Sequence, residues 1–261
     1  MTPQRFSGKV AVVTGAGAGI GRAVAVRLAA EGAAVAVLDL AAAAAADTVA
    51  AITDAGGQAL AVAADVASPD DVHAGVRSTV AAFGGIDVLV NNAGVVRYGT
   101  VPELSVEDWH LTLATNLTGT FLTCKYAIPE MRARGGGAIV NTASAQAFAS
   151  QPLVAAYAAS KGAVVAMTRS LAVDHAADGI RVTCVCPGSV ETPMLRYGAE
   201  LLGDGDAVAT MRDWGRQHPI GRLIQPSDVA ALVAFLASDD AVTITGAPYL
   251  VDGGLLARLG V

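Results

Sequence analysis

Residues 12–29 read "VVTGAGAGIGRAVAVRLA", a short apolar run joined to a helix-favouring run by a turn that contains four glycines. The run before the glycines is rich in valine and predicts a buried strand that ends near Thr14. Glycine lets a pyrophosphate approach the backbone closely, and the first turn of the following helix offers free N–H groups to it. The stretch therefore predicts a strand–turn–helix unit at which phosphates bind.

An acidic residue, Asp39, closes the next predicted strand, which spans residues 33–39. A glycine cluster by itself also fits a simple tight turn. A carboxylate at this place, however, accepts hydrogen bonds from the adenosine ribose of a dinucleotide. The same carboxylate would repel a ribose 2′-phosphate, and the adjacent Leu40 and Ala41 carry no compensating charge. We therefore expect a dinucleotide site that prefers NAD over NADP.

Short apolar runs alternate with helix-favouring segments along the whole chain. The runs are continuously apolar, as in strands that are covered on both faces, so we expect an α/β fold. This fold would be a single-domain, Rossmann-like, doubly wound sheet of seven parallel strands with helices on both faces, covering residues 1–261. The predicted strands are 9–14, 33–39, 58–65, 86–92, 137–144, 180–187 and 247–253, and the predicted helices are 20–31, 41–55, 69–83, 107–133, 154–177 and 227–237.

One stretch, at about 189–225, looks irregular, because it mixes apolar residues with glycine and aspartate. Long insertions in compact domains are often functional, so we expect a substrate lid there. Its apolar side chains suggest a neutral, fairly hydrophobic substrate, although the same side chains could instead pack the lid on the body. They are Met194, Leu195, Tyr197, Leu201, Leu202, Met211 and Trp214.

The composition excludes several classes of protein. Hydrophobic residues make up 53% of the 261 residues and charged residues 15%, which is ample for a large core. The net charge is −6 at pH 7 and there is no basic block, so we expect no nucleic-acid partner. We see no signal peptide and no apolar run long enough to span a membrane.

The three cysteines form no CxxC pair, so we expect buried free thiols in a reducing compartment and a cytoplasmic protein. The four histidines are scattered without ligand spacing, so we expect surface or packing roles for them and no metal.

A series of short motifs runs in order along the chain: "TGAGAGIG" (14–21), "NNAG" (91–94), "TNLTGT" (115–120), "NTASAQA" (141–147), "YAASK" (157–161), "CPGSVETP" (186–193), "HPIGRLIQPSDVA" (218–230) and "VDGG" (251–254). The set resembles the short-chain dehydrogenase/reductase family over essentially the whole chain. The glycine spacing matches that family's TGxxxGxG rather than the broader GxGxxG. The resemblance implies a homotetramer and a catalytic group of Asn116, Ser144, Tyr157 and Lys161.

The resemblance also implies particular cofactor contacts. Asp65 and Val66 would contact adenine, Asn92 the adenosine half, and Thr192 the nicotinamide carboxamide. The family pattern has isoleucine or valine two residues before this threonine, and Val190 satisfies it. The full set of expected cofactor-binding residues is Gly15, Gly17, Gly19, Ile20, Gly21, Asp39, Leu40, Asp65, Val66, Asn92, Ala93, Gly94, Tyr157, Lys161, Pro187, Gly188, Val190 and Thr192.

Tyr157 and Lys161 lie four residues apart in a predicted helix and so share one face. Taken alone they would fit a structural pair. A cation ~4 Å from the phenolate at an effective dielectric of ~20 would contribute ~4 kcal/mol, which would bring the pKa of the phenol near 7. Ser144 would then hold the substrate oxygen against Tyr157. The family resemblance assigns to Asn116 a water-mediated proton path from Lys161.

These expectations predict an NAD-dependent oxidoreductase that interconverts a secondary alcohol and a ketone, with Tyr157 as general acid/base. One alternative is a 3-oxoacyl-carrier-protein reductase, which would require NADPH and a basic docking surface. Another is a non-catalytic nucleotide-binding protein, for which the catalytic group would have no purpose. If the family geometry holds, the substrate pocket would be lined by Val95, Tyr98, Gln146 and Phe148.

Overall fold

The computed structural model describes residues 4–203 and 205–258. The domain predicted at 1–261 also includes residues 1–3, 204 and 259–261, which lie outside the described residues. Its parallel strands form one sheet in the order β3-β2-β1-β4-β5-β6-β7. This sheet confirms the predicted doubly wound topology, in which the strand order reverses between β1 and β4. The strands are β1 (Val10–Thr14), β2 (Ala34–Asp39), β3 (Gln58–Ala63), β4 (Val88–Asn91), β5 (Gly137–Thr142), β6 (Ile180–Pro187) and β7 (Pro248–Val251).

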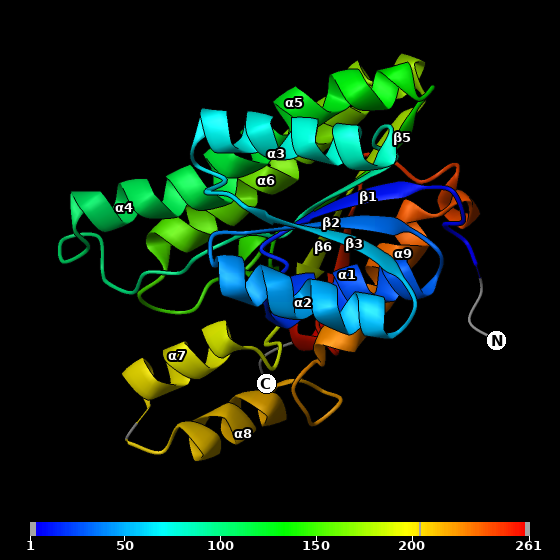
Figure 1. Cartoon of the computed structure of the whole chain (residues 1–261). Helices are drawn as coiled ribbons and strands as arrows, with labels where there is room; N and C mark the ends of the chain where they lie inside the picture. The colour runs from blue at the N-terminus through cyan, green and yellow to red at the C-terminus, as the bar shows by residue number, and fades with distance from the viewer. Residues whose placement is uncertain (1–3, 204, 259–261) are drawn as a thin grey trace.

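Helices cover both faces of this sheet (Figure 1). On one face α1, α2 and α9 lie together, and on the other α3, α5 and α6 do, with α7 and α8 outside these two layers. The helices are α1 (Gly19–Ala30), α2 (Ala42–Asp54), α3 (Pro69–Phe83), α4 (Val106–Leu113), α5 (Gly119–Ala133), α6 (Ala155–Asp174), α7 (Pro193–Leu202), α8 (Ala207–Gln217) and α9 (Pro226–Ala237).

The core follows the two layers. One apolar cluster joins strand residues such as Val13 and Val90 to α1 and α9, and another joins Leu89 and Ile139 to α3 and α5. β1 is buried along its whole length, whereas β3 is half exposed because it is an edge strand with a single neighbour. The edge strands β3 and β7 are therefore less buried than their continuously apolar sequences predict, although helices from both layers contact β3.

The predicted helix at 107–133 is wrong as a single helix, because a π-helical turn at Ala114–Thr118 divides it into α4 and α5. Such widened turns accompany functional positions in many proteins. Here the turn holds Asn116, whose buried side chain bonds to groups outside the helix. Those tertiary bonds explain a backbone irregularity that helix propensity alone does not predict.

The segment 189–225, predicted to be a substrate lid, is also more regular than expected, because it contains α7 and α8. Each helix has an N-cap of the usual kind. The Thr192 hydroxyl accepts from the Leu195 amide at 3.3 Å, with Pro193 in the first turn, and the Asp206 carboxylate accepts from the Ala209 amide at 2.9 Å. Within the described part of the chain, no helix is both long and apolar enough to cross a membrane.

Candidate active site

The glycine turn and Asp39 come together at the carboxyl ends of β1 and β2. The Asp39 carboxylate accepts hydrogen bonds from the Gly17 amide at 2.8 Å and from the Ala41 amide at 2.9 Å. A Cβ at Gly17 would lie 2.9 Å from the carboxylate, so this close approach requires glycine. Gly15 and Gly19 have φ values of 60° and 53°, in the left-handed region that glycine adopts most easily.

A set of hydrogen bonds that was not predicted from the sequence holds this turn against the end of β4. The Thr14 hydroxyl accepts from the backbone amides of Asn92 and Ala93, at 3.0 and 3.1 Å. The Asn92 side chain donates to the carbonyl oxygens of Thr14 and Gly15, both at 3.1 Å. Asn92 therefore fixes the shape of the turn. Thr14, in the "TG" pair at the end of the first strand, could have indicated these bonds, because a buried hydroxyl needs a hydrogen-bond partner.

The expected adenine-side residues follow β3. The Asp65 carboxylate accepts from the Ala67 amide at 2.9 Å, which shapes the turn. Val66 is buried and packs in a small cluster with Ala93. A Cβ at Gly119, the first residue of α5, would lie 2.8 Å from Val66. This part of the predicted cofactor site thus reaches from β3 across to β4 and α5.

Asn116 is fully buried and its amide is fully used. Its Oδ1 accepts from the Val95 amide at 2.8 Å, and its Nδ2 donates to the Val95 carbonyl and to Ser160 Oγ, both at 3.0 Å. The Ser160 hydroxyl in turn donates to the Tyr157 carbonyl at 2.7 Å. The structure therefore places Asn116 as a link between the segment after β4 and the start of α6.

Lys161 is 3% exposed, and its ammonium group lies over the ring of Tyr157. Its Nζ donates to the Thr142 carbonyl at 2.8 Å and lies 5.5 Å from the centre of the Tyr157 ring. Burial lowers the pKa of Lys161 to about 8. A Cβ at Gly94 would lie 3.5 Å from Nζ, so Gly94 leaves room for this ammonium group.

Tyr157 lies near the start of α6, and Ser144 lies just past the end of β5. Burial raises the pKa of Tyr157 to about 12, and interaction with the Ser144 hydroxyl offsets part of that rise. The expectation of a pKa near 7 from Lys161 alone is therefore wrong. The ammonium group bonds to the Thr142 carbonyl, and the surrounding protein disfavours the phenolate.

The segment after β6 completes the site. The Gly188 amide donates to the Val251 carbonyl at 3.1 Å, and the Ser189 amide donates to His218 Nε2 at 3.1 Å. The buried His218 ring also pairs its Nδ1 with the Trp214 carbonyl at 3.1 Å, so one histidine joins α8 to this segment. A Cβ at Gly19 would lie 3.1 Å from Thr192, so the segment rests against the start of α1.

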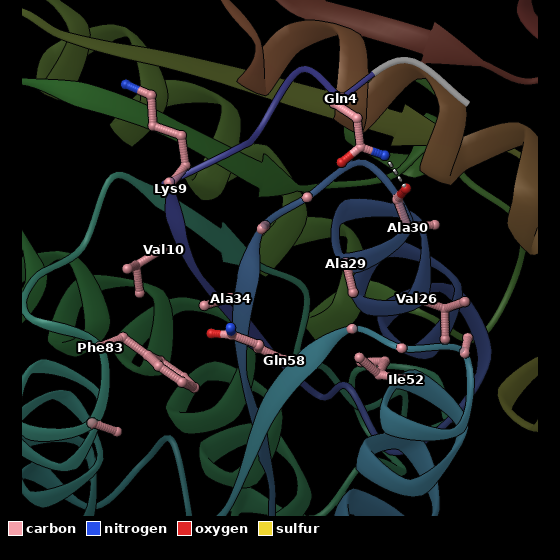
Figure 2. A pocket seen from close by; sticks show the side chains of 17 residues that line it. Gln4, Lys9, Val10, Val26, Ala29, Ala30, Ala34, Ile52, Gln58 and Phe83 are labelled. Atoms are coloured by element: carbon pink, nitrogen blue, oxygen red, sulfur yellow. Dashed lines mark hydrogen bonds between the residues drawn. The ribbon is translucent and has the colours of Figure 1, made fainter. Parts of the chain in front are cut away.

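A pocket of about 690 Å³ lies at the opposite edge of the sheet (Figure 2). It is lined by Lys9, Ala34 and Gln58, which lie at the amino ends of β1, β2 and β3. Open α/β sheets bind their ligands outside the carboxyl ends of the strands. The candidate site is therefore the edge that holds the glycine turn, Ser144 and Tyr157.

A doubly wound parallel sheet whose first turn is glycine-rich defines a dinucleotide-binding protein. A family model described as "Enoyl-(Acyl carrier protein) reductase" matches residues 15–256. The chain is 39% identical to cyclohexanol dehydrogenase of Acinetobacter sp. (strain SE19) over 255 residues, which cover 97% of each chain. It is 44% identical to cis-4-hydroxycyclohexanecarboxylate dehydrogenase of Sinomonas cyclohexanicum over 255 residues, 97% of this chain and 99% of the relative.

Solved structures agree with these relatives. The crystal structure of levodione reductase superposes with a TM-score of 0.95 at 34% identity, covering 98% of this chain and 100% of that one. The chain therefore belongs to the short-chain dehydrogenase/reductase family, a family of oxidoreductases whose dehydrogenases use nicotinamide cofactors.

Proposed function

We propose that the chain is an NAD-dependent oxidoreductase that interconverts a secondary alcohol and a ketone, with Tyr157 as general acid/base. The observation that carries the proposal is the position of Tyr157, beside Ser144 and near the Lys161 ammonium group, at the sheet edge that also holds the glycine turn. Acid/base catalysis of this kind needs a proton-transfer group within reach of the substrate oxygen.

The residues at this edge fit a nicotinamide dinucleotide. The glycine turn and the start of α1 would hold its pyrophosphate, Asp39 its adenosine ribose, and Thr192 its nicotinamide end. When bound, the oxidised cofactor supplies the hydride acceptor and a positive charge. Tyr157 would take the hydroxyl proton of the alcohol, Ser144 would hold its oxygen, and Lys161 would stabilise the phenolate.

Two observations bear on the substrate. Two curated relatives are named for the oxidation of ring alcohols, cyclohexanol and cis-4-hydroxycyclohexanecarboxylate. The lid presents apolar side chains, because Met194, Tyr197 and Leu201 on α7 are exposed while Met211 is buried and packs the lid. The two names favour a cyclic secondary alcohol, and the apolar side chains of the lid favour a neutral, fairly hydrophobic one such as cyclohexanol over a carboxylate.

The second candidate is a 3-oxoacyl-carrier-protein reductase. The description of the family model names a reductase of the enoyl rather than the 3-oxoacyl group, so the two share only the acyl carrier protein. Asp39 disfavours the NADPH that this role would require, and a net charge of −6 disfavours docking of an acidic carrier. Assay of cyclic, aromatic and sugar alcohols with NAD and then NADP, beside a 3-oxoacyl thioester with NADPH, tests the proposal. Faster turnover of the thioester would favour the second candidate.

The pH dependence should report the protonation of Tyr157. Because burial raises the pKa of Tyr157 to about 12, the phenol stays protonated at neutral pH until the cofactor's positive charge lowers that pKa. Alcohol oxidation needs the base form, so its kcat/KM should rise by about tenfold per pH unit below the pKa of the complex. Ketone reduction needs the acid form and should weaken at high pH. Oxidation that is fastest at acidic pH would contradict this assignment.

We also propose a homotetramer in a reducing compartment, the cytoplasm. Large apolar side chains are exposed on α4 and α5, namely Val106, Trp109, Leu111 and Phe121, and an unpartnered surface of this kind favours association. The cysteines are buried free thiols, which agrees with reducing conditions. Light scattering should give four times the chain mass of 26.1 kDa, and a monomer mass would contradict the assembly.

A further inference from the structure

The lid helix α7 touches the body of the protein at a glycine. A Cβ placed on Gly198 would overlap the hydroxyl oxygen of Tyr98, and it would lie 3.3 Å from Cζ of that ring and 3.6 Å from Cη2 of Trp214. Gly198 does not belong to the glycines with left-handed φ, so its backbone would accept alanine without strain. Space beneath α7, rather than backbone conformation, therefore requires glycine at this position.

Aromatic rings from three segments meet around this contact. Tyr98 lies on the loop after β4, Tyr197 on α7 and Trp214 on α8. The ring centres of Tyr98 and Tyr197 are 6.2 Å apart with a tilt of 43°. Burial raises the pKa of Tyr98, so its phenol meets the lid as a neutral group at neutral pH. The contact thus joins the two lid helices to the body through rigid side chains.

The loop that carries Tyr98 is fixed to the start of α6, the helix that carries Tyr157. The Gly99 amide donates to the Leu153 carbonyl at 2.8 Å, and Gly99 also pairs with Val154 in an isolated parallel bridge. Val154 is the N-cap of α6, three residues before Tyr157. Leu153 has a φ of 69°, a strained conformation for a residue with a side chain, and such strain persists where the surroundings impose it. The backbone beside Tyr98 is therefore tied to the start of α6, which carries Tyr157.

We propose that Tyr98 is a specificity-determining residue, whose phenol, seated against Gly198, sets the height of α7 above Tyr157 and so limits the size of the carbinol that reaches it. The proposal rests on the proposed function, because it takes Tyr157 as the group that meets the substrate oxygen. The electrostatic effect of Tyr98 on the pKa of Tyr157 is consistent with two phenols that lie near one another.

The proposal predicts different effects for a larger side chain at position 198 and a smaller side chain at position 98. Gly198→Ala should force the Tyr98 ring away from α7, disturb the cavity and lower kcat/KM for cyclohexanol more than for 2-butanol. Tyr98→Ala should open the cavity and raise the ratio of kcat/KM for 4-tert-butylcyclohexanol to that for cyclohexanol by about tenfold or more, as pocket contacts of this size discriminate. Gly162→Ala is the matched control, because that helical glycine has open space around its Cβ position among the described residues.

A double-mutant cycle isolates the contact. Tyr98→Phe removes the hydroxyl that a methyl group at position 198 would overlap and leaves the ring carbon 3.3 Å from it, a tight contact that a shift of a few tenths of an ångström relieves, so Tyr98→Phe should restore most of the activity lost in Gly198→Ala. The same coupling can be measured without any enzymatic turnover, from the fluorescence emission of Trp214. A Trp109→Phe background removes the other tryptophan of the chain. Gly198→Ala should shift the emission of Trp214, and Tyr98→Phe should return it.

The outcomes separate the two proposals. A wild-type chain that oxidises no secondary alcohol refutes the proposed function and with it the role of Tyr98, while the fluorescence cycle still decides whether the lid contact exists. Turnover together with additive effects of Gly198→Ala and Tyr98→Phe overturns the contact. Coupled effects with an unchanged size ratio in Tyr98→Ala overturn the specificity role and leave a purely structural contact.

Discussion

Tyr157→Phe is expected to lower kcat for alcohol oxidation by about 10²- to 10⁴-fold, the range that general acid–base groups contribute. The phenyl ring keeps the packing of α6 but has no hydroxyl to take the substrate proton. Steady-state assays with cyclohexanol and NAD measure the change, and binding of NAD to the variant shows whether the site is intact.

Tyr126→Phe provides the matched control for this substitution. Tyr126 lies on α5 and stacks on His73 with 4.8 Å between ring centres, and it packs on the cluster of Val66 and Ala93 through its ring, which phenylalanine keeps. It should retain wild-type kcat. Equal turnover of Tyr157→Phe and the wild type would show that another group moves the proton.

Asp39→Ala is expected to shift the preference from NAD toward NADP by about 100-fold, because a carboxylate facing a phosphate at an effective dielectric of ~20 is unfavourable by about 3 kcal/mol. The ratio of kcat/KM for the two cofactors measures the shift. Part of the change would come from the turn, since Asp39 also accepts the amides of Gly17 and Ala41.

Asp39→Asn separates charge from turn geometry, because it keeps the shape and one acceptor oxygen while it removes the charge. If repulsion of the 2′-phosphate sets the preference, Asp39→Asn should show most of the shift. A wild-type chain that already prefers NADP, or an unchanged ratio in both variants, would refute the role given to Asp39.

Local patterns were sufficient for most of the sheet and its helices. The predicted strand at 180–187 and helix at 69–83 coincide with β6 and α3, because an apolar run and a Ser-Pro helix start mark their ends. The π turn at Asn116 could not be predicted in this way, since it depends on Val95 and Ser160, which are distant in sequence. The starts of α7 and α8 are marked in the sequence by Thr192-Pro193 and by Asp206, although the composition of segment 189–225 is irregular.

In the candidate site, too, the sequence predicts the residues but not their tertiary contacts. The ordered motifs predict a catalytic group of Asn116, Ser144, Tyr157 and Lys161, and the fold brings these residues to one region. The pKa of Tyr157 could not be predicted from the sequence. The spacing of four residues places Lys161 on the same helix face as Tyr157, but it does not show that Lys161 bonds to the Thr142 carbonyl or that the phenol is buried. The contact between Tyr98 and Gly198 joins segments about a hundred residues apart, as only a three-dimensional arrangement can show.

The most direct measurement follows the hydrogen on the carbinol carbon. The chain is incubated with NAD and cyclohexanol that carries deuterium at that carbon, and the products are analysed by mass spectrometry. The account predicts that reduced NAD carries the deuterium, that ketone forms in equal amount, and that Tyr157→Phe forms both about 10²- to 10⁴-fold more slowly. Reduced NAD without deuterium, or no reduction of NAD by any secondary alcohol, would contradict it.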